Sequence, residues 1–172
     1  VLYYLGQTVR DAVPELLDDM QAALRSIGQQ LPDNRVPIRF GTWVGGDRDG
    51  NPNVSPETTD QVLGLQRRHA LAILVAAVIA MGHELSVSTR VHDVSDELRE
   101  AVEADRRALK DIAHRVDWSE PYRIRCEAIR RRLIATSDGD TSRSGYRSPA
   151  DLDADLAVIE KSLRDNGGGL LA

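Results

Sequence analysis

The residues between Trp43 and Val54 have the types and the spacing that binding chemistry requires. The stretch reads WVGGDRDGNPNV, in which three glycines and a proline surround the charged side chains Asp47, Arg48 and Asp49. Glycine permits positive φ and a close approach of the backbone, so successive N–H groups can converge on a phosphate or a carboxylate. The guanidinium of Arg48 could add a two-pronged contact to the same anion. The sequence therefore predicts an anion-binding loop.

The candidate site is this loop, with the arginine at its centre. Asp47 and Asp49 would orient Arg48, or pair with it when no ligand is bound. A second interpretation stays open, in which the acidic and amide side chains make turn and capping hydrogen bonds and Arg48 belongs only to an ion pair. Spacing alone does not decide between the two. The predicted anion-binding residues are Gly45, Gly46, Asp47, Arg48, Asp49, Gly50 and Asn51.

A calcium loop is the first alternative chemistry for this stretch. Asp47, Asp49 and Asn51 match the opening ligand spacing of an EF-hand. The match then fails, because Pro52 stands where the sharp turn needs glycine and Thr58 where a bidentate glutamate should close the cage. Calcium binding is therefore not predicted.

Motifs for zinc and for nucleotides fail as well. His83 and Glu84 begin an HExxH pattern, but Val87 occupies the place of the second histidine. The double glycine Gly45-Gly46 fits neither the dinucleotide-binding pattern nor the Walker pattern. The other histidines have no ligand spacing. We therefore predict no metal ligand and no catalytic residue in this chain; the scattered histidines are His69, His92 and His114.

Charge, cysteine content and hydropathy exclude three classes of protein. The 172 residues include 22 Lys and Arg against 27 Asp and Glu, a net charge of −5, so there is no basic surplus for binding nucleic acid. A single cysteine, Cys126, excludes an internal disulfide framework and fits the reducing cytoplasm. The apolar run Ala70–Met81 is shorter than the roughly 18 residues that span a bilayer, so it predicts a buried helix and no membrane partner.

The spacing of apolar residues predicts a mainly α-helical fold. The first helix covers Val1–Ile27, where Pro14 should kink it or open a second helix, and Gly28 and Pro32 end the segment. Further helices begin at serine caps or at Glu120. Their expected ranges are Pro56–Leu85 after the cap Ser55, a helix from Ser95 to Val116 with Leu98, Val102, Leu109 and Ile112 as its apolar stripe, Glu120–Ala135, and Ser148–Arg164; the polar stretch Thr136–Arg147 is expected to be a loop.

One β-strand is predicted, at residues Val36–Trp43. Apolar side chains alternate there with Pro37, Arg39 and Gly41, without a helical period. A lone strand cannot satisfy its ladder hydrogen bonds, so we expect a partner strand outside this chain. Together with a first residue that is not Met, this suggests one internal fragment of a longer protein, with N-terminal helices at 1–35, the strand and loop at 36–54, and a helical region at 55–172.

The stretch RFGTWVGGDRDGNPNV, Arg39 to Val54, resembles the phosphoenolpyruvate carboxylase family. Every residue of GGDRDGNP, Gly45 to Pro52, matches the family's signature. Softer similarities extend the resemblance over essentially the whole chain. They are LSVSTRV at Leu85–Val91, EPYRIRCEAIRRRL at Glu120–Leu133 and DLAVIEKSLRDNGG at Asp155–Gly168.

The resemblance implies a large, mainly helical cytoplasmic enzyme, a homotetramer built around a β/α barrel with many extra helices. Such an enzyme carboxylates phosphoenolpyruvate with bicarbonate and Mg²⁺, giving oxaloacetate and phosphate. The strand at 38–43 would then belong to the barrel, with the loop at its C-terminal face. Arg48 would serve either the substrate or an effector such as a sugar phosphate or a dicarboxylate. The family's TAHPT-type histidine motif and its metal-binding carboxylates do not occur in this chain, so we expect the fragment alone to be inactive.

A helical interaction module without catalysis is the alternative function. Basic and acidic side chains that could form docking surfaces are clustered on the last two predicted helices. We expect these charges to be solvated, since surface charge usually serves solubility. The basic set is Arg123, Arg125, Arg130, Arg131 and Arg132, and the acidic set is Asp151, Asp153 and Asp155.

Overall fold

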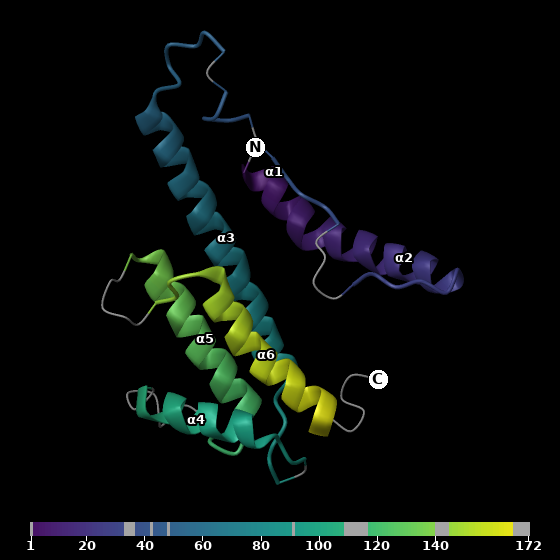
Figure 1. The fold of residues 1–172 in the computed structure, drawn as a ribbon. Helices are drawn as coiled ribbons and strands as arrows, with labels where there is room; N and C mark the ends of the chain where they lie inside the picture. Colours follow the sequence, from purple (N-terminus) through teal and green to yellow (C-terminus); the bar gives the residue numbers. More distant parts are fainter. Residues whose placement is uncertain are drawn as a thin grey trace. The chain divides into compact units, whose positions relative to one another are not determined.

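The computed structural model describes residues 2–32, 37–41, 43–47, 49–90, 92–108, 117–139 and 145–166. These residues form helices and connecting turns, without a β-strand in the part described (Figure 1). Two compact units divide the chain, Val1–Ile73 and Leu74–Ala172, and their boundary falls within α3. The elements are α1 (Leu2–Gln7), the π-helix η1 (Thr8–Ala12), α2 (Val13–Ser26), α3 (Pro56–Glu84), α4 (Asp96–Ala108), α5 (Pro121–Ser137) and α6 (Pro149–Asn166).

Pro14 opens a second helix within the first predicted one, as the sequence indicated. It lies in the first turn of α2, and the turn before it is the π-helix η1. The Val13 N–H donates to the carbonyl of Thr8, five residues back. Since proline has no N–H to donate four residues back, the wider turn accommodates the missing bond.

The end of α2 is closed by Gly28, which confirms the predicted boundary. Gly28 has φ of +73°, and its N–H donates to the carbonyl of Arg25 at 3.1 Å. The next N–H, from Gln29, donates to the carbonyl of Leu24 at 2.9 Å. This pair of bonds satisfies the last helical carbonyls and needs a left-handed residue, which glycine adopts without strain.

The predicted strand at 36–43 is wrong for the residues that the structure describes. Residues 37–41 and Trp43 have no regular structure, and Val36 and Thr42 lie outside the described residues. A strand is stabilised by ladder bonds to a neighbour, and no such ladder pairs with 37–41 in the described part of this chain. The alternation of apolar residues alone therefore does not produce a strand here.

Helix α3 has the predicted bounds but not the predicted burial. The Thr58 N–H donates to Oγ of Ser55 at 3.2 Å, which confirms the N-cap, and the helix ends one residue before the expected Leu85. Its buried residues in the described structure are Val78 and Gly82, whereas Leu63 is 57% exposed. The expectation of a buried helix was therefore wrong for this chain, since most apolar side chains of α3 are partly or fully exposed.

Among the described residues, α3 is also the one helix long and apolar enough to cross a membrane by length and composition. A single helix of this kind is weak evidence for a membrane span, since length and composition alone select it.

Helices α4, α5 and α6 pack together around the main apolar core of the second unit (Figure 1). Leu98 and Ile129 are fully buried, and Ser162 joins the three helices by accepting the Ser95 N–H at 3.0 Å and bonding the Tyr122 hydroxyl at 2.9 Å. Oγ of Ser95 caps α4 as predicted. The core also contains Val94, Val102, Ile124, Cys126, Ala128, Leu133, Ile159 and Leu163. The predicted end of this helix at Val116, with Leu109, Ile112 and His114, lies outside the described residues.

The last two helices are close to their predicted ranges. Helix α5 begins at Pro121 and extends two residues past the expected Ala135, so the predicted loop begins later than expected, and its residues 140–144 lie outside the described part. Helix α6 begins at Pro149, where Oδ2 of Asp151 accepts the N–H groups of Arg147 and Ser148 at 3.0 and 2.9 Å. The acid of the Ser-Pro-x-acid pattern, Asp151, thus satisfies two backbone N–H groups at the start of the helix.

Candidate functional site

The glycine-rich loop is folded back on itself and docked on the first turns of α3. The carbonyl of Trp43 accepts the N–H groups of Gly46 and Asp47, each at 3.2 Å. Gly45 has φ of +74°, and a Cβ placed there would lie 2.6 Å from Cγ2 of Val62. Its carbonyl accepts the Thr59 hydroxyl at 2.6 Å. Gly45 is therefore required both by its backbone conformation and by the close approach of α3.

The acidic and amide side chains of the loop make local turn bonds. Oδ1 of Asp47 accepts the Asp49 N–H at 3.2 Å, and Oδ1 of Asn51 accepts the Asn53 N–H at 3.0 Å. Both are bonds from a side chain to the backbone two residues on, which is the usual turn chemistry of Asp and Asn. Asp47 and Asn51 therefore make turn bonds, and the expected contact of Asp47 with Arg48 stays a prediction.

The anion-facing role of the loop stays a prediction, because Arg48 lies outside the described residues. Gly46, Asp49, Gly50 and Asn51 are exposed. Gly50 has φ of +69°, and a Cβ placed there would meet no atom within 4 Å. A side chain at Gly50 would therefore meet open space, so its glycine is required by the backbone conformation and not by a close neighbour. In the described part of the chain no group of three or more His, Cys, Asp or Glu residues could hold a metal ion.

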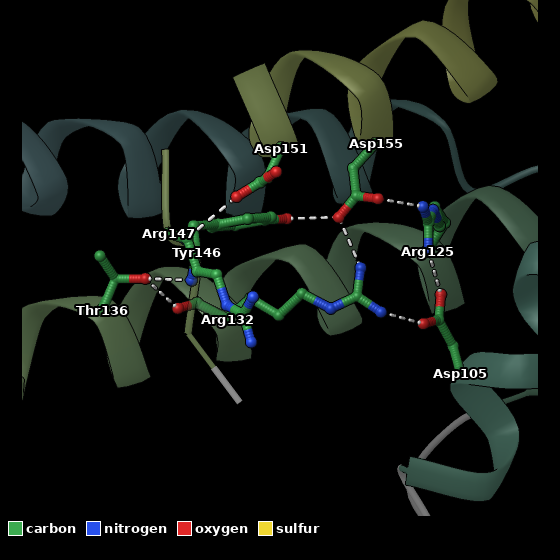
Figure 2. Close-up of polar contacts among 8 residues, drawn as sticks. All are labelled: Asp105, Arg125, Arg132, Thr136, Tyr146, Arg147, Asp151 and Asp155. Atoms are coloured by element: carbon green, nitrogen blue, oxygen red, sulfur yellow. Dashed lines mark hydrogen bonds and ion pairs between the residues drawn. The ribbon is translucent and has the colours of Figure 1, made fainter. Parts of the chain in front are cut away.

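A second polar cluster lies between α4, α5 and α6, where Asp105, Arg125, Asp155 and Arg132 form a closed ring (Figure 2). Arg125 donates to Asp105 at 2.8 Å and to Asp155 at 2.5 Å. Arg132 donates to Asp105 at 2.7 Å and to Asp155 at 2.5 Å. Each carboxylate oxygen accepts from one guanidinium nitrogen. We call this set the Asp–Arg ring; two positive and two negative charges leave it neutral.

The Asp–Arg ring is buried at one side and reaches solvent at the other. The side chains of Asp105 and Arg125 are 1% and 6% exposed, whereas that of Arg132 is 33% exposed. The Tyr146 hydroxyl donates to Oδ2 of Asp155 at 2.7 Å from the segment before α6 (Figure 2). Burial and this hydrogen bond both raise the pKa of Tyr146. Burial acts to lower the pKa of Arg132, but Asp155 and Asp105 raise it by more.

Thr136, near the end of α5, holds the segment around Tyr146 in place through hydrogen bonds. Oγ1 of Thr136 accepts the Tyr146 N–H at 2.7 Å and itself donates to the carbonyl of Arg132 at 2.7 Å (Figure 2). A Cβ at Gly145 would lie 3.0 Å from the Thr136 backbone nitrogen. Only a residue without a side chain fits this approach easily, so the segment enters α6 along one defined path.

The structure corrects the expectation that the charges of the last two helices are solvated. Arg125, Arg132 and Asp155 are ring members, and the fourth member, Asp105, was not predicted at all. A signal was present: Asp105 follows Leu98 and Val102 on the same helical stripe, at core spacing. A charged residue on an apolar stripe is buried only when it is paired.

The remaining charges of the two predicted faces make local contacts. Asp151 caps α6, Arg123 pairs with Glu120 at 3.1 Å, and Asp153 is exposed. Arg130 and Arg131 both pair with Glu127, at 2.7 and 3.3 Å.

Comparison with known proteins identifies relatives along the whole chain. The family model described as phosphoenolpyruvate carboxylase matches residues 1–172. A phosphoenolpyruvate carboxylase of Roseiflexus castenholzii is 35% identical, over 99% of this chain and 20% of that protein. That of Xanthomonas euvesicatoria pv. vesicatoria is 36% identical, over 96% of this chain and 18% of the relative, and that of Rhodopseudomonas palustris is 40% identical over 78% and 15%. The chain thus spans about a fifth of the length of these relatives or less.

Proposed function

Because the chain belongs to the phosphoenolpyruvate carboxylase family over its whole length, we propose that it is part of an enzyme that carboxylates phosphoenolpyruvate with bicarbonate. The products are oxaloacetate and phosphate. The match of the family model to residues 1–172 carries this proposal, and the signature Gly45–Pro52 supports it. Since the chain spans about a fifth of its relatives, we place the catalytic histidine motif on the rest of the polypeptide. By the same membership we propose that the enzyme is cytoplasmic and forms a homotetramer, with each subunit built around a β/α barrel. We propose neither nucleic acid nor a membrane as a partner.

The divalent metal of the family, Mg²⁺, would stabilise negative charge that develops during the reaction. The residues described here do not fit that metal, because they contain no cluster of three or more ligand side chains. The nearest approach to one in the sequence is Asp47, Asp49 and Asn51, where Oδ1 of Asp47 and Oδ1 of Asn51 already accept backbone N–H groups. We therefore assign the metal ligands to the rest of the enzyme and derive no step of this chain through the metal.

The role that we assign to this chain is to bind an anion at the glycine-rich loop. Positive φ at Gly45 and Gly50 lets the loop turn twice without strain, and no described atom lies within 4 Å of a Cβ placed at Gly50. Arg48, between these glycines, supplies the guanidinium that would grip a phosphate with two parallel N–H donors. The anion is either the phosphate of phosphoenolpyruvate or an effector, such as a sugar phosphate or a dicarboxylate.

Substitution of Arg48 by lysine in the full-length enzyme tests this role. Lysine keeps the charge but cannot reproduce the two-pronged contact. Loss of a charge-assisted hydrogen bond in a binding site corresponds to about 1.5–3 kcal/mol, so kcat/KM for phosphoenolpyruvate, or the response to a sugar phosphate, should fall by roughly 10- to 100-fold. The matched control is Arg164→Lys, because Arg164 is 64% exposed in a surface ion pair.

Each outcome of this experiment has a separate meaning. A lower kcat/KM without activator assigns Arg48 to the substrate, and a loss confined to activation assigns it to the effector site. Kinetics and activation equal to those of the unsubstituted enzyme would refute the role of Arg48 while leaving the carboxylation proposal intact. Absence of carboxylation in the unsubstituted full-length enzyme would instead refute the proposed function.

The alternative of a non-catalytic interaction module has less support than the sequence suggested. Its main argument was the two charged faces, and three of those charged residues are engaged in the Asp–Arg ring. We therefore retain a single proposed function.

A further inference from the structure

The Asp–Arg ring joins side chains that are far apart along the chain but meet in one closed set of ion pairs. Arg125 and Arg132 are seven residues apart on α5, which corresponds to about 10.5 Å of helix rise. Their side chains nevertheless converge on the same two carboxylates, one from α4 and one from α6 (Figure 2). Each carboxylate must therefore lie between the two guanidiniums.

This requirement fixes the axial position of α4 and α6 against α5. A shift of either helix by one turn, about 5.4 Å, would bring its carboxylate past one guanidinium and out of reach of the other. Apolar contacts do not discriminate in this way, since they are non-directional. Leu98 and Val102 are four residues apart, so a shift of one turn would still place an apolar side chain of this stripe against α5.

The ring is less suited to supplying stability. Removing charges from water is expensive, and buried ion pairs replaced by apolar residues of similar volume are often neutral or stabilising. Among the described residues, Nε of Arg125 is buried without a hydrogen-bond partner, so the ring is not fully satisfied. In an incompletely satisfied buried network, the desolvation cost of the unpaired group offsets part of the favourable Coulombic energy.

We propose that the Asp–Arg ring is a registry device, which selects one position of α4 and α6 against α5 and makes the three helices a single cooperative unit. Tyr146 extends the device, because its hydroxyl binds Asp155 and its N–H binds Thr136. The contacts that fix the positions of the helices therefore also fix the position of the segment that leads into α6.

The first test is a double-mutant cycle in the full-length protein between Asp105 on α4 and Asp155 on α6, each replaced by asparagine; the readout is the opening equilibrium constant of the α4–α6 amides from hydrogen exchange. The two carboxylates are coupled through the two shared guanidiniums. The matched control is Glu97 and Lys161, which join the same two helices by a direct bond of 2.6 Å but are 54% and 55% exposed. We replace these residues by glutamine and methionine.

The buried pair should be more strongly coupled than the exposed pair. The effects of Asp105→Asn and Asp155→Asn on the opening equilibrium constant of these amides should be non-additive by about fivefold or more, in either direction. The control pair should be additive within about twofold. A smaller coupling in the ring than fivefold, or one equal to that of the control pair, would overturn the proposal.

Hydrogen exchange in the same variants reports on cooperativity. Asp155→Asn, on α6, should lower the protection of amides in α4 as well as in α6, whereas Lys161→Met should leave α4 protected. If protection is lost in α6 alone, the ring does not join the helices and the proposal is wrong.

The second test removes all four charges, so that no lone buried charge can unfold the chain. The variant combines Asp105→Leu, Arg125→Met, Arg132→Met and Asp155→Leu. We expect it to remain helical, to lose the dispersion of its amide NMR signals in α4–α6 and to bind a hydrophobic dye, as helices without a single register do. A well-dispersed spectrum with native protection in all three helices would overturn the proposal, since apolar packing and the Ser162 bonds to Ser95 and Tyr122 would then set the register without the ring.

Discussion

The loss of one carboxylate from the Asp–Arg ring is the perturbation whose magnitude follows most directly from the structure. Asp105→Asn keeps the size of the side chain but removes its charge. Asp105 is 1% exposed and accepts from Arg125 at 2.8 Å and from Arg132 at 2.7 Å. The variant would leave two guanidiniums facing the single carboxylate of Asp155, with an uncompensated positive charge in the interior.

The expected cost is a large part of the stability of a small domain. Each pair of opposite charges about 4 Å apart attracts by about 4 kcal/mol at an effective dielectric constant of 20, before desolvation is subtracted. Removing one partner of a buried pair destabilises proteins by about 3–5 kcal/mol. With a urea dependence of about 2 kcal/mol per molar, the unfolding midpoint should fall by roughly 2 M.

Urea unfolding followed by circular dichroism measures this shift, and hydrogen exchange in α5 assigns it to the second unit. The control is Glu160→Gln, which breaks an ion pair of similar length, 2.5 Å, with Arg164. Both members of that pair are more than 60% exposed, so the midpoint should not change measurably. If Asp105→Asn shifted the midpoint no more than the control does, the ring would not be buried and paired in solution, and the reasoning would be refuted.

Three further predictions concern other described contacts. Gly6→Ala should destabilise the chain by about 1–3 kcal/mol, because its Cβ would lie 2.1 Å from Nε2 of His69; thermal unfolding measures this, and the added substitution His69→Ala should recover part of the loss. Burial raises the pKa of Cys126 from its ordinary value of 9.0 to about 11, so stability that is fully present below pH 9 should decrease as the pH rises through 11. The decrease amounts to about 3 kcal/mol, and Cys126→Ala should flatten this part of the pH profile of urea midpoints under reducing conditions. Ser55→Ala should cost about 1 kcal/mol at the start of α3, and Ser55→Asp should restore it; faster exchange of the Thr58 amide in the alanine variant alone would confirm the cap.

Much of the helical fold could be predicted because its signals are local. Pro14 opens α2, Gly28 ends it, and Ser55 and Ser95 cap α3 and α4. In each case the deciding contacts lie within five residues along the chain. Such contacts are formed by almost any chain that carries those residues, so the sequence reports them without knowledge of the tertiary structure.

Local sequence patterns could not predict three features: the absence of a strand in the described part of 36–43, the exposure of α3, and the positions of the charged side chains. A strand and a buried helix both depend on a partner surface, and the pattern of a segment does not say whether that partner is present. In the candidate loop the sequence placed the glycines and the turn residues correctly. It could not decide whether Asp47 binds Arg48 or the turn; the structure shows a turn bond of Asp47, and the contact with Arg48 stays a prediction because Arg48 lies outside the described residues.

The sequence by itself determined the family, the helix starts and ends, and the turn chemistry of the loop, since these depend on residue types and near neighbours. Only the tertiary structure decided the pairing of Arg125 with Asp105 and Asp155, 20 and 30 residues away along the chain. The physical reason is that an isolated helix exposes an arginine to water at almost no cost, whereas three packed helices exclude water and bury that arginine only where carboxylates from the other two helices meet it.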